Sequence, residues 1–285
     1  MNIGICQFSS EGQKELNLQK SIGLIRDLAQ KGAEIICLQE LFLTDYFCFE
    51  ENPAFFDLAD DYSNSKTIQS LAQTSKETKT VLIASCYEKR LPGLYHNTII
   101  VFDQGVQLGI YRKHHIPDDP GYYEKYFFAP GDEGYKVFDT SKGKIGTLIC
   151  WDQWYPEAAR ATALKGAEII FYPTAIGWDM NDPKIIRDEE IEAWKIMHQS
   201  HAISNGIPIV AVNRIGEENG LKFWGTSVII NAMGRILYQA SIENQESKVI
   251  FIDTKETSYY RHRWPFLRDR RIDTYQSLLK RADNE

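Results

Sequence analysis

Two kinds of apolar segment alternate along the 285-residue chain, and no other feature constrains its fold as strongly. Short apolar runs rich in β-branched residues indicate buried strands, and longer segments with apolar side chains every three or four positions indicate helices. Leu18, Ile22 and Ile25, for example, recur at helical spacing. Gly32 follows them and is suited to end a helix. The alternation predicts an α/β fold with helices on the outer faces of the sheets.

The expected elements run through the chain without a linker or a break in composition, so residues 1–285 are predicted to form one domain. Strands are predicted at 3–8, 34–38, 80–87, 98–102, 106–111, 144–150, 168–172, 208–213, 227–231 and 248–253. Helices are predicted at 14–31, 65–76, 156–165 and 188–204, and turns at 103–105 and 232–234. The segment GAEII occurs at 32–36 and again at 166–170, each time between a helix and a strand. This repeat indicates either a duplicated unit in two pseudo-symmetric halves or a chance similarity between common helix-to-strand joints.

Composition argues against nucleic-acid and membrane partners. The net charge is −7, whereas a nucleic-acid binder normally presents a basic face. The one basic cluster, 261–271, is interleaved with Trp264 and Phe266 and is interpreted as a packed tail. No apolar run reaches the roughly 18–20 residues of a membrane helix, and MNIGICQFSS lacks the features of a secretory signal. Five cysteines without a CxxC pair are typical of a reducing compartment, and we expect a cytoplasmic protein.

Three chemically active side chains follow predicted strands. Glu40 comes after GAEIICLQ, Lys113 after VQLGIYR, and Cys150 at the end of KIGTLIC. In layered α/β folds, sites form beyond the carboxyl ends of strands, so these residues could converge on one pocket. A cysteine thiolate attacks carbonyl carbons, a nearby lysine favours the thiolate and stabilises an oxyanion, and a glutamate can move the protons. Spacing alone favours the simpler interpretation of a surface glutamate, a surface lysine and a buried cysteine.

The segments around these residues resemble the three signatures of the nitrilase (carbon–nitrogen hydrolase) superfamily, in the same order. They are LQELF around Glu40, YRKHHIP around Lys113 and ICWDQWYPEAAR around Cys150. Further similar segments are FFAPGD (127–132), GAEIIFYPTAIG (166–177), VAVNRIG (210–216), FWGTS (223–227) and FLRDRR (266–271). The resemblance implies a four-layer α-β-β-α sandwich, a Glu40–Lys113–Cys150 triad, and a second glutamate at Glu124. It also implies a homo-oligomer, a dimer or larger, and neither a metal nor an organic cofactor.

Within the superfamily, HIPDDPGYYEKYFF, CWDQWYPEAARA and FYPTAIG resemble the group that hydrolyses N-carbamoylputrescine. The chain departs from this group at Asp119, where a glycine is expected, and loop 177–188 has no clear counterpart. The resemblance implies a small-molecule ureido-amine substrate that is cleaved to putrescine, carbon dioxide and ammonia. N-carbamoyl amino acids, ureido acids and ω-amides are the alternative substrates.

The charges near the nucleophile favour an amine-bearing substrate. A substrate carboxylate needs a bidentate cationic partner, and the segment 150–154 has no arginine. It has an acid, Asp152, which is expected to be structural because it lies in the nucleophile turn. Asp118 is therefore the predicted partner of the substrate amine. The acidic run 188–190 is interpreted as a solvated helix start, with a contact to the amine as the alternative.

Three further residues are predicted to contact the substrate. Tyr46 and Trp151 lie close in sequence to Glu40 and Cys150, and Thr174 lies in FYPTAIG. The other aromatic residues between 42 and 56 are expected to pack in the core.

Two other classes of protein are alternatives to this interpretation. A metal hydrolase would need a ligand set, but His198 and His201 have no HExxH or comparable partner, so no metal site is predicted. A non-catalytic binding or assembly module on the same fold is the second alternative, and faster alkylation of Cys150 than of the other cysteines would exclude it. The tail, about 255–285, is predicted to pack on the domain or on a neighbouring subunit, because it would otherwise expose apolar patches.

Overall fold

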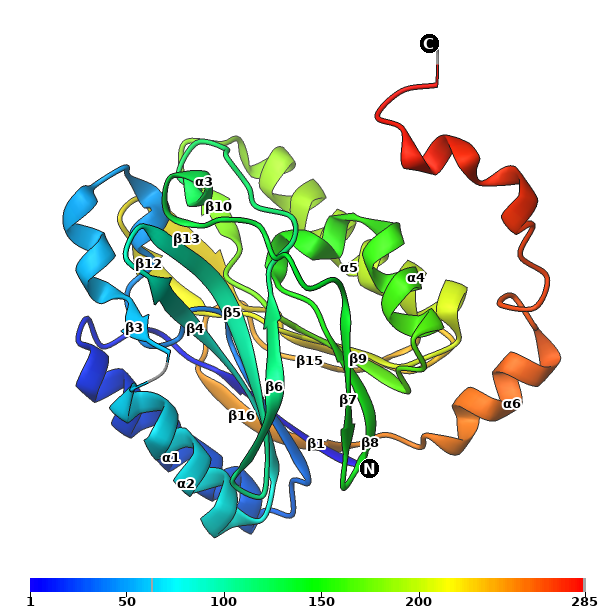
Figure 1. Ribbon diagram of the computed structural model, residues 1–285, viewed down its shortest axis with the longest axis horizontal. Helices are drawn as coiled ribbons and strands as arrows, with labels where there is room; N and C mark the ends of the chain where they lie inside the picture. Colours follow the sequence, from blue (N-terminus) through cyan, green and yellow to red (C-terminus); the bar gives the residue numbers. More distant parts are fainter. Residues whose placement is uncertain (63, 284–285) are drawn as a thin grey trace.

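The computed structural model describes residues 1–62 and 64–283 of the chain (Figure 1). Two β-sheets lie face to face, and helices cover the outer face of each. This arrangement confirms the predicted four-layer α-β-β-α sandwich. No helix in the described part of the chain is long and apolar enough to cross a membrane.

The first sheet has seven strands in the order β16-β1-β2-β4-β5-β6, and the short β3 pairs with β4. Strands β1, β2 and β4 are parallel, and the outer pairs are antiparallel. The bounds are β1 Asn2–Gln7, β2 Ile35–Leu38, β3 Asp60–Asp61, β4 Val81–Leu91, β5 Leu94–Asp103, β6 Val106–Arg112 and β16 Glu246–Phe251.

The second sheet has six strands in the order β15-β14-β11-β9-β8-β7, of which β8, β9 and β11 are parallel. A small sheet, β10-β13-β12, lies apart from it. The bounds are β7 Lys136–Thr140, β8 Gly143–Thr147, β9 Ile169–Pro173, β10 Gly177–Asp179, β11 Ile209–Val212, β12 Ile215–Glu218, β13 Leu221–Trp224, β14 Val228–Ile230 and β15 Ile236–Gln239.

Helices α1 and α2 pack on the first sheet, and α4 and α5 pack on the second. Helix α2 begins where the Ser65 side chain accepts a hydrogen bond from the backbone of Ile68, and α5 ends at Gly206, whose φ is +60°. The bounds are α1 Lys14–Gln30, α2 Lys66–Thr78, α3 Glu124–Phe127, α4 Pro156–Leu164, α5 Lys184–Asn205 and α6 Lys255–Arg263. Short 3₁₀ helices are η1 Phe47–Phe49, η2 Pro53–Leu58, η3 Cys150–Trp154, η4 Ile272–Thr274 and η5 Gln276–Leu279.

The core follows the alternation of side chains along each strand. In β1, Ile3 and Ile5 belong to the apolar cluster between the two sheets, whereas Cys6 belongs to the cluster under α1 and α2. Both faces of the central parallel strands are therefore buried, which explains why their sequences read as continuous apolar runs.

The repeated GAEII segments occupy equivalent places in the two halves. Each follows a helix, α1 or α4, and leads into a central parallel strand, β2 or β9. The β1-α1-β2 and β8-α4-β9 units are both parallel crossovers, and β2 contacts β9 across the sandwich. These matching positions favour the interpretation as a duplicated unit.

Several predicted boundaries were wrong. The strand expected at 144–150 ends at Thr147, and Cys150 instead begins η3 with a φ of +37°. The small sheet, the edge strands β7 and β15, and helix α6 were not predicted, because their sequences are short or mainly polar. The turns at 103–105 and 232–234 do connect neighbouring strands.

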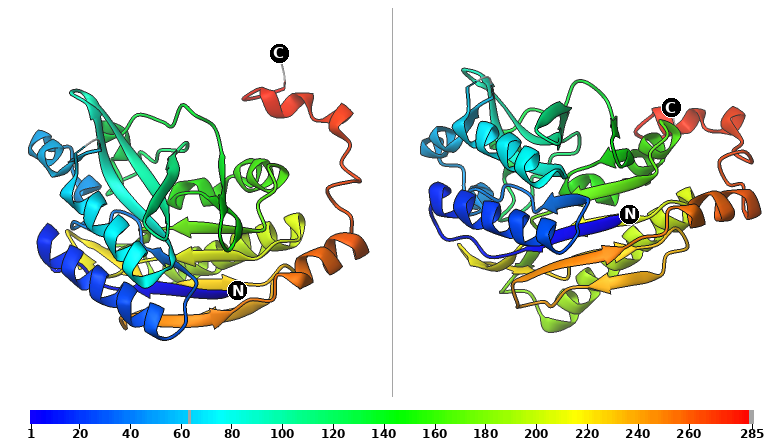
Figure 2. Two further views of the ribbon diagram at one scale, coloured as in Figure 1. Left: turned by 60° about the horizontal axis from the view of Figure 1, so that its bottom comes forward. Right: turned by 90° about the horizontal axis from the view of Figure 1, so that it is seen from below.

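The C-terminal tail leaves the sandwich after β16 and extends away from it (Figure 2). Helix α6 keeps some contact, since Arg261 Nε donates to the Asn205 carbonyl oxygen at 3.2 Å. Beyond α6, apolar side chains are uncovered: Trp264 is 46% exposed and Leu279 is 86% exposed.

Candidate active site

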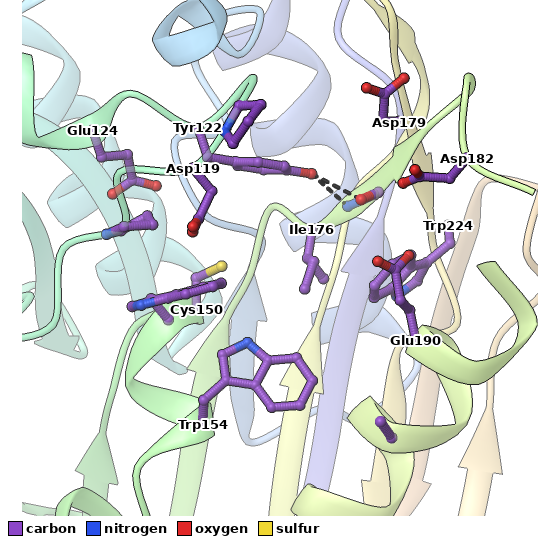
Figure 3. Close-up of a pocket in the computed structure, with 15 residues that line it drawn as sticks. Asp119, Tyr122, Glu124, Cys150, Trp154, Ile176, Asp179, Asp182, Glu190 and Trp224 are labelled. Atoms are coloured by element: carbon purple, nitrogen blue, oxygen red, sulfur yellow. Dashed lines mark hydrogen bonds between the residues drawn. The ribbon is translucent and has the colours of Figure 1, made fainter. Parts of the chain in front are cut away.

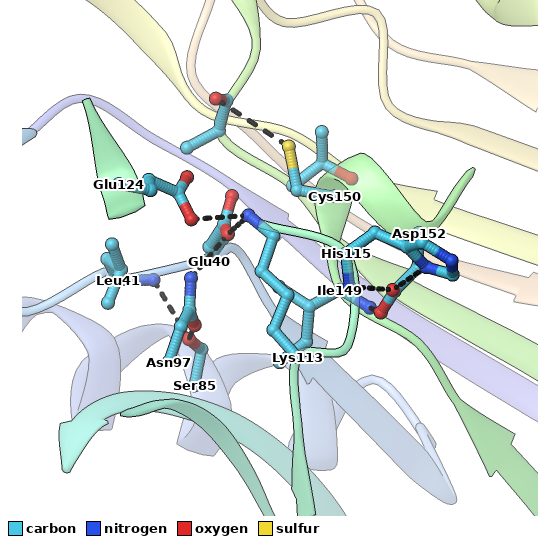
Figure 4. Close-up of polar contacts among 12 residues, drawn as sticks. Glu40, Leu41, Ser85, Asn97, Lys113, His115, Glu124, Ile149, Cys150 and Asp152 are labelled. Carbon is cyan, nitrogen blue, oxygen red and sulfur yellow. Dashed lines mark hydrogen bonds and ion pairs between the residues drawn. The ribbon is translucent and has the colours of Figure 1, made fainter. Parts of the chain in front are cut away.

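Glu40, Lys113 and Cys150 converge between the two sheets (Figure 4). Glu40 lies two residues beyond β2, and Lys113 directly follows β6 of the same sheet. Cys150 comes from the second sheet, three residues beyond β8. Lys113 Nζ donates to Glu40 Oε1 at 2.9 Å and to Glu124 Oε2 at 2.7 Å. The structure thus brings together all four side chains for which a catalytic role was predicted.

The Lys113 ammonium is buried between two carboxylates. Burial alone would lower its pKa, but the negative charges of Glu124 and Glu40 outweigh burial and raise that pKa well above its usual value. The two carboxylates therefore favour the charged form of Lys113. Burial also raises the pKa of Glu124, to about 7, with Glu40 adding to the rise and Lys113 opposing it.

The surroundings of Cys150 favour the neutral thiol over the thiolate. Burial and the carboxylates of Glu40 and Glu124 raise its pKa well above the usual value, against the opposing effect of Lys113. The thiol therefore needs a base when it attacks. Glu40 Oε2 is buried and has no hydrogen-bond partner among the described residues, so it is free to accept the proton.

The other atoms of Glu40 are held by neighbouring strands. Asn97 Nδ2, on β5, donates to Glu40 Oε1 at 2.7 Å. The Glu40 backbone N–H points to the Thr174 carbonyl oxygen at 3.4 Å. The next residue, Leu41, has a φ of +46° and donates its N–H to Ser85 Oγ at 3.0 Å. The second sheet thus holds the backbone of Glu40, and the first sheet orients its carboxylate.

A cavity of about 480 Å³ opens beside the thiol (Figure 3). Cys150 and Glu124 lie at one end, and Asp182, Glu190 and Trp224 lie towards the other. The lining residues are Pro117, Asp119, Pro120, Tyr122, Glu124, Cys150, Trp151, Trp154, Ile176, Gly177, Asp179, Asp182, Glu190, Ala193 and Trp224. Neither lysine nor arginine is among these described residues, so the cavity has an acidic end and no cationic one.

The residues predicted to contact substrate are distributed differently from expectation. Trp151 lines the cavity, but Tyr46, Thr174 and Asp118 do not. Tyr46 is buried behind Glu124, and its hydroxyl donates to Glu124 Oε1 at 2.9 Å. Thr174 is buried and contributes its backbone carbonyl to Glu40.

Asp118, the predicted partner of the substrate amine, does not line the cavity. Its side chain is 48% exposed and lies 3.9 Å from Lys125 Nζ. Its neighbour Asp119 lines the cavity instead. In the acidic run 188–190, Asp188 pairs with Lys184 on the surface, whereas Glu190 lines the cavity.

The sequence did not predict most of the residues at the end of the cavity that lies away from Cys150. Asp179 and Asp182 lie in the segment 177–188, which could not be aligned clearly with the related group, and Asp179 and Trp224 belong to the small sheet. A usable signal was the pair of acids in GWDMNDP just before an acidic helix start. Nothing in the spacing indicated that Trp224 would face the same space.

The histidines considered as metal ligands make other contacts. His198 Nδ1 lies 2.9 Å from the Trp194 carbonyl oxygen, and His201 Nε2 lies 2.7 Å from the Gln153 carbonyl oxygen. Within residues 1–62 and 64–283, no group of three or more histidine, cysteine or acidic side chains is arranged to hold a metal ion.

Comparison with known proteins places the chain in a family. The carbon-nitrogen hydrolase family matches residues 2–261. The chain is 41% identical to N-carbamoylputrescine amidase from Arabidopsis thaliana, over 98% of this chain and 95% of that protein. It is 35% identical to citrullinase from Francisella tularensis, over 99% of both. The crystal structure of a carbon-nitrogen hydrolase from Helicobacter pylori G27 superposes with a TM-score of 0.96, at 42% identity and 99% coverage of both chains. The chain belongs to the carbon–nitrogen hydrolase family and is a hydrolase of carbon–nitrogen bonds.

Proposed function

We propose that the protein hydrolyses N-carbamoylputrescine to putrescine, carbon dioxide and ammonia. The observation that carries this proposal is the cavity, which joins a Cys150 thiol and a Glu40–Lys113–Glu124 network to an acidic end without cations. A ureido group would bind at the thiol, and an ammonium group would bind at the acids. The Arabidopsis relative, which is named for this reaction, supports the choice of substrate.

In the first half-reaction, the thiol attacks the ureido carbon and its proton passes to Glu40 Oε2. The Lys113 ammonium stabilises the negative oxygen of the tetrahedral intermediate. Collapse of this intermediate breaks the bond to the terminal nitrogen. Ammonia leaves with the proton from Glu40, and an N-alkylcarbamoyl thioester remains on Cys150.

In the second half-reaction, Glu40 takes a proton from water, and the resulting hydroxide attacks the thioester carbon. The thiolate leaves and recovers its proton from Glu40. The product is the N-alkylcarbamate, which loses carbon dioxide to give putrescine. Glu124 holds Lys113 in place through the 2.7 Å contact, and Tyr46 holds Glu124 in turn.

The substrate ammonium is assigned to Glu190 and Asp182 in place of Asp118. Burial raises the pKa of Glu190, and the neighbouring Asp182 adds to this rise. A cation placed between the two carboxylates would relieve their repulsion. The Glu190 side chain makes no hydrogen bond or ion pair with the described residues and lines the cavity, so its carboxylate is available to a ligand. Trp224 adds an aromatic face near this position.

Citrulline is the main competing substrate, because the Francisella relative is named a citrullinase. It also carries a ureido group, but its carboxylate would need a cationic partner that the described cavity lining lacks. The test is the kcat/KM for ammonia release from N-carbamoylputrescine, citrulline, an N-carbamoyl amino acid, 3-ureidopropionate and an ω-amide. The proposal requires N-carbamoylputrescine to be preferred. Preference for any carboxylate-bearing substrate would refute the charge argument.

We also propose that the protein acts as a homo-oligomer in which the tail packs on a second copy. The uncovered apolar side chains beyond α6, including Trp264, Phe266 and Leu279, support this proposal. The five cysteines are unpaired, which fits the proposed cytoplasmic location.

A further inference from the structure

The Asp152 carboxylate accepts four hydrogen bonds, although no step of the proposed mechanism involves it. Its side chain is fully buried and does not line the cavity. Oδ1 accepts from the His115 backbone N–H at 3.0 Å and from His115 Nδ1 at 2.7 Å. Oδ2 accepts from the Ile149 backbone N–H at 3.0 Å and from the Tyr111 hydroxyl at 2.8 Å. Only an ionised carboxylate can accept from all four donors at once.

These donors flank one catalytic residue and immediately precede another. Tyr111 and His115 flank Lys113 at the end of β6, in the first sheet. Ile149 immediately precedes Cys150, which follows β8 in the second sheet. The Asp152 carboxylate therefore connects the strand end that carries the ammonium to the turn that carries the thiol (Figure 4).

The nucleophile turn needs such support, because its backbone is strained. Cys150 has a φ of +37°, a conformation that side-chain-bearing residues rarely adopt. Two contacts close the turn from opposite directions: the Asp152 backbone N–H donates to the Ile149 carbonyl at 2.9 Å, and the Ile149 N–H donates to the Asp152 carboxylate. Outside the turn, the His115 ring stacks on Tyr155, with ring centroids 3.7 Å apart.

We propose that Asp152 is a positioning residue that sets the placement of the Cys150 thiol relative to the Lys113 ammonium across the two sheets. It acts through Ile149, His115 and Tyr111 and does not touch the substrate. This inference rests on the proposed function only in assuming that thiol and ammonium act together. Asp152 is the acidic residue nearest to Cys150 in the sequence, and this inference gives it a structural role.

The test compares Asp152→Asn with Ser75→Ala. The asparagine keeps the size of the side chain but presents N–H groups to one of the two donor pairs. Ser75 is buried near the end of α2, where its hydroxyl donates to the Thr80 carbonyl and accepts from the Gly105 N–H, so its loss is expected to destabilise the fold away from the site. Four quantities are measured for each variant: the thermal midpoint, kcat, KM and the iodoacetamide alkylation rate of Cys150.

For Asp152→Asn, kcat and the alkylation rate are expected to fall about 10- to 100-fold, while KM changes by less than about threefold. Ser75→Ala is expected to lower the thermal midpoint and leave both rates unchanged. A folded Asp152→Asn protein with wild-type rates would overturn the proposal, as would equal losses of rate in Ser75→Ala.

Two milder variants keep the inference testable if Asp152→Asn does not fold. Tyr111→Phe and His115→Ala each remove one side-chain donor to Asp152, and each is expected to slow alkylation of Cys150 several-fold. Unchanged alkylation in both would refute the positioning role. Alkylation needs no assumption about the substrate, so a wild-type protein that hydrolyses no ureido compound would refute the proposed function without deciding this inference.

Discussion

Glu124→Gln should lower kcat strongly without unfolding the protein. The substitution keeps the shape of the side chain and one oxygen that can accept from Lys113 Nζ, which lies 2.7 Å from Glu124 Oε2. At a pH above the pKa of Glu124, it also removes one of the two negative charges that face the buried ammonium. We expect kcat to fall about a hundredfold or more, because small misplacements of a catalytic cation are costly. The fold should remain intact.

The magnitude of the stability effect follows from the pKa of Glu124. Burial raises this pKa from 4.5 to about 7, so the folded protein holds a proton that the unfolded chain releases between these values. Stability therefore falls as the pH rises through this window, by a total of about 3 kcal/mol. Between pH 5 and pH 8 the wild type should lose about 2–3 kcal/mol through this group, and Glu124→Gln should not.

Urea unfolding of both proteins at pH 5 and pH 8 measures this difference, because the other titrating groups are common to both and cancel. Tyr46→Phe is the matched control: it removes the 2.9 Å hydrogen bond to Glu124 and keeps the carboxylate. That hydrogen bond lowers the pKa, so its loss should move the decline in stability to higher pH. The same pH dependence in wild type and Glu124→Gln would refute the reasoning, and full activity of Glu124→Gln would remove its catalytic role.

Three further outcomes are expected. Cys150→Ser and Glu40→Gln should each lower kcat by several orders of magnitude with the fold unchanged by circular dichroism, because each group acts in the transition state; wild-type turnover in either would contradict the mechanism. Glu190→Gln should lower kcat/KM for N-carbamoylputrescine at least about tenfold but barely affect an uncharged N-alkylurea, whereas Asp118→Asn should match wild type; the reverse pattern would restore Asp118 as the amine partner. Removing residues 264–285 should reduce the assembled mass in light scattering, and a full-length monomer at micromolar concentration would exclude the proposed packing of the tail.

The layers of the fold were predictable because the central strands are buried on both faces. Runs such as 34–38 and 168–172 can form little else than core strands, and the helices between them have clear apolar stripes. The small sheet β10-β13-β12 was not predictable in the same way. Its strands are three or four residues long, too short for a periodic pattern to stand out.

The residues at the reactive end of the site were identifiable because the segments around Glu40, Lys113 and Cys150 resemble the three family signatures; their positions after predicted strands were not sufficient alone. Their environment was not identifiable, because it depends on contacts between segments distant in the chain. The partners of Asp152 come from residues up to 41 positions away, and Tyr46 meets Glu124 across 78 positions. Asp118 and Asp119 show the limit most clearly: they are adjacent in sequence, but only Asp119 lines the cavity.

The most direct test of the central claim is mass spectrometry of the Cys150 peptide after the protein is mixed with N-carbamoylputrescine and quenched in acid within one turnover. The thioester mechanism predicts an N-alkylcarbamoyl adduct on Cys150 that forms as ammonia is released and decays as putrescine appears. Cys150→Ala should form no adduct and release no ammonia. Ammonia and putrescine produced at the wild-type rate by Cys150→Ala would contradict the account.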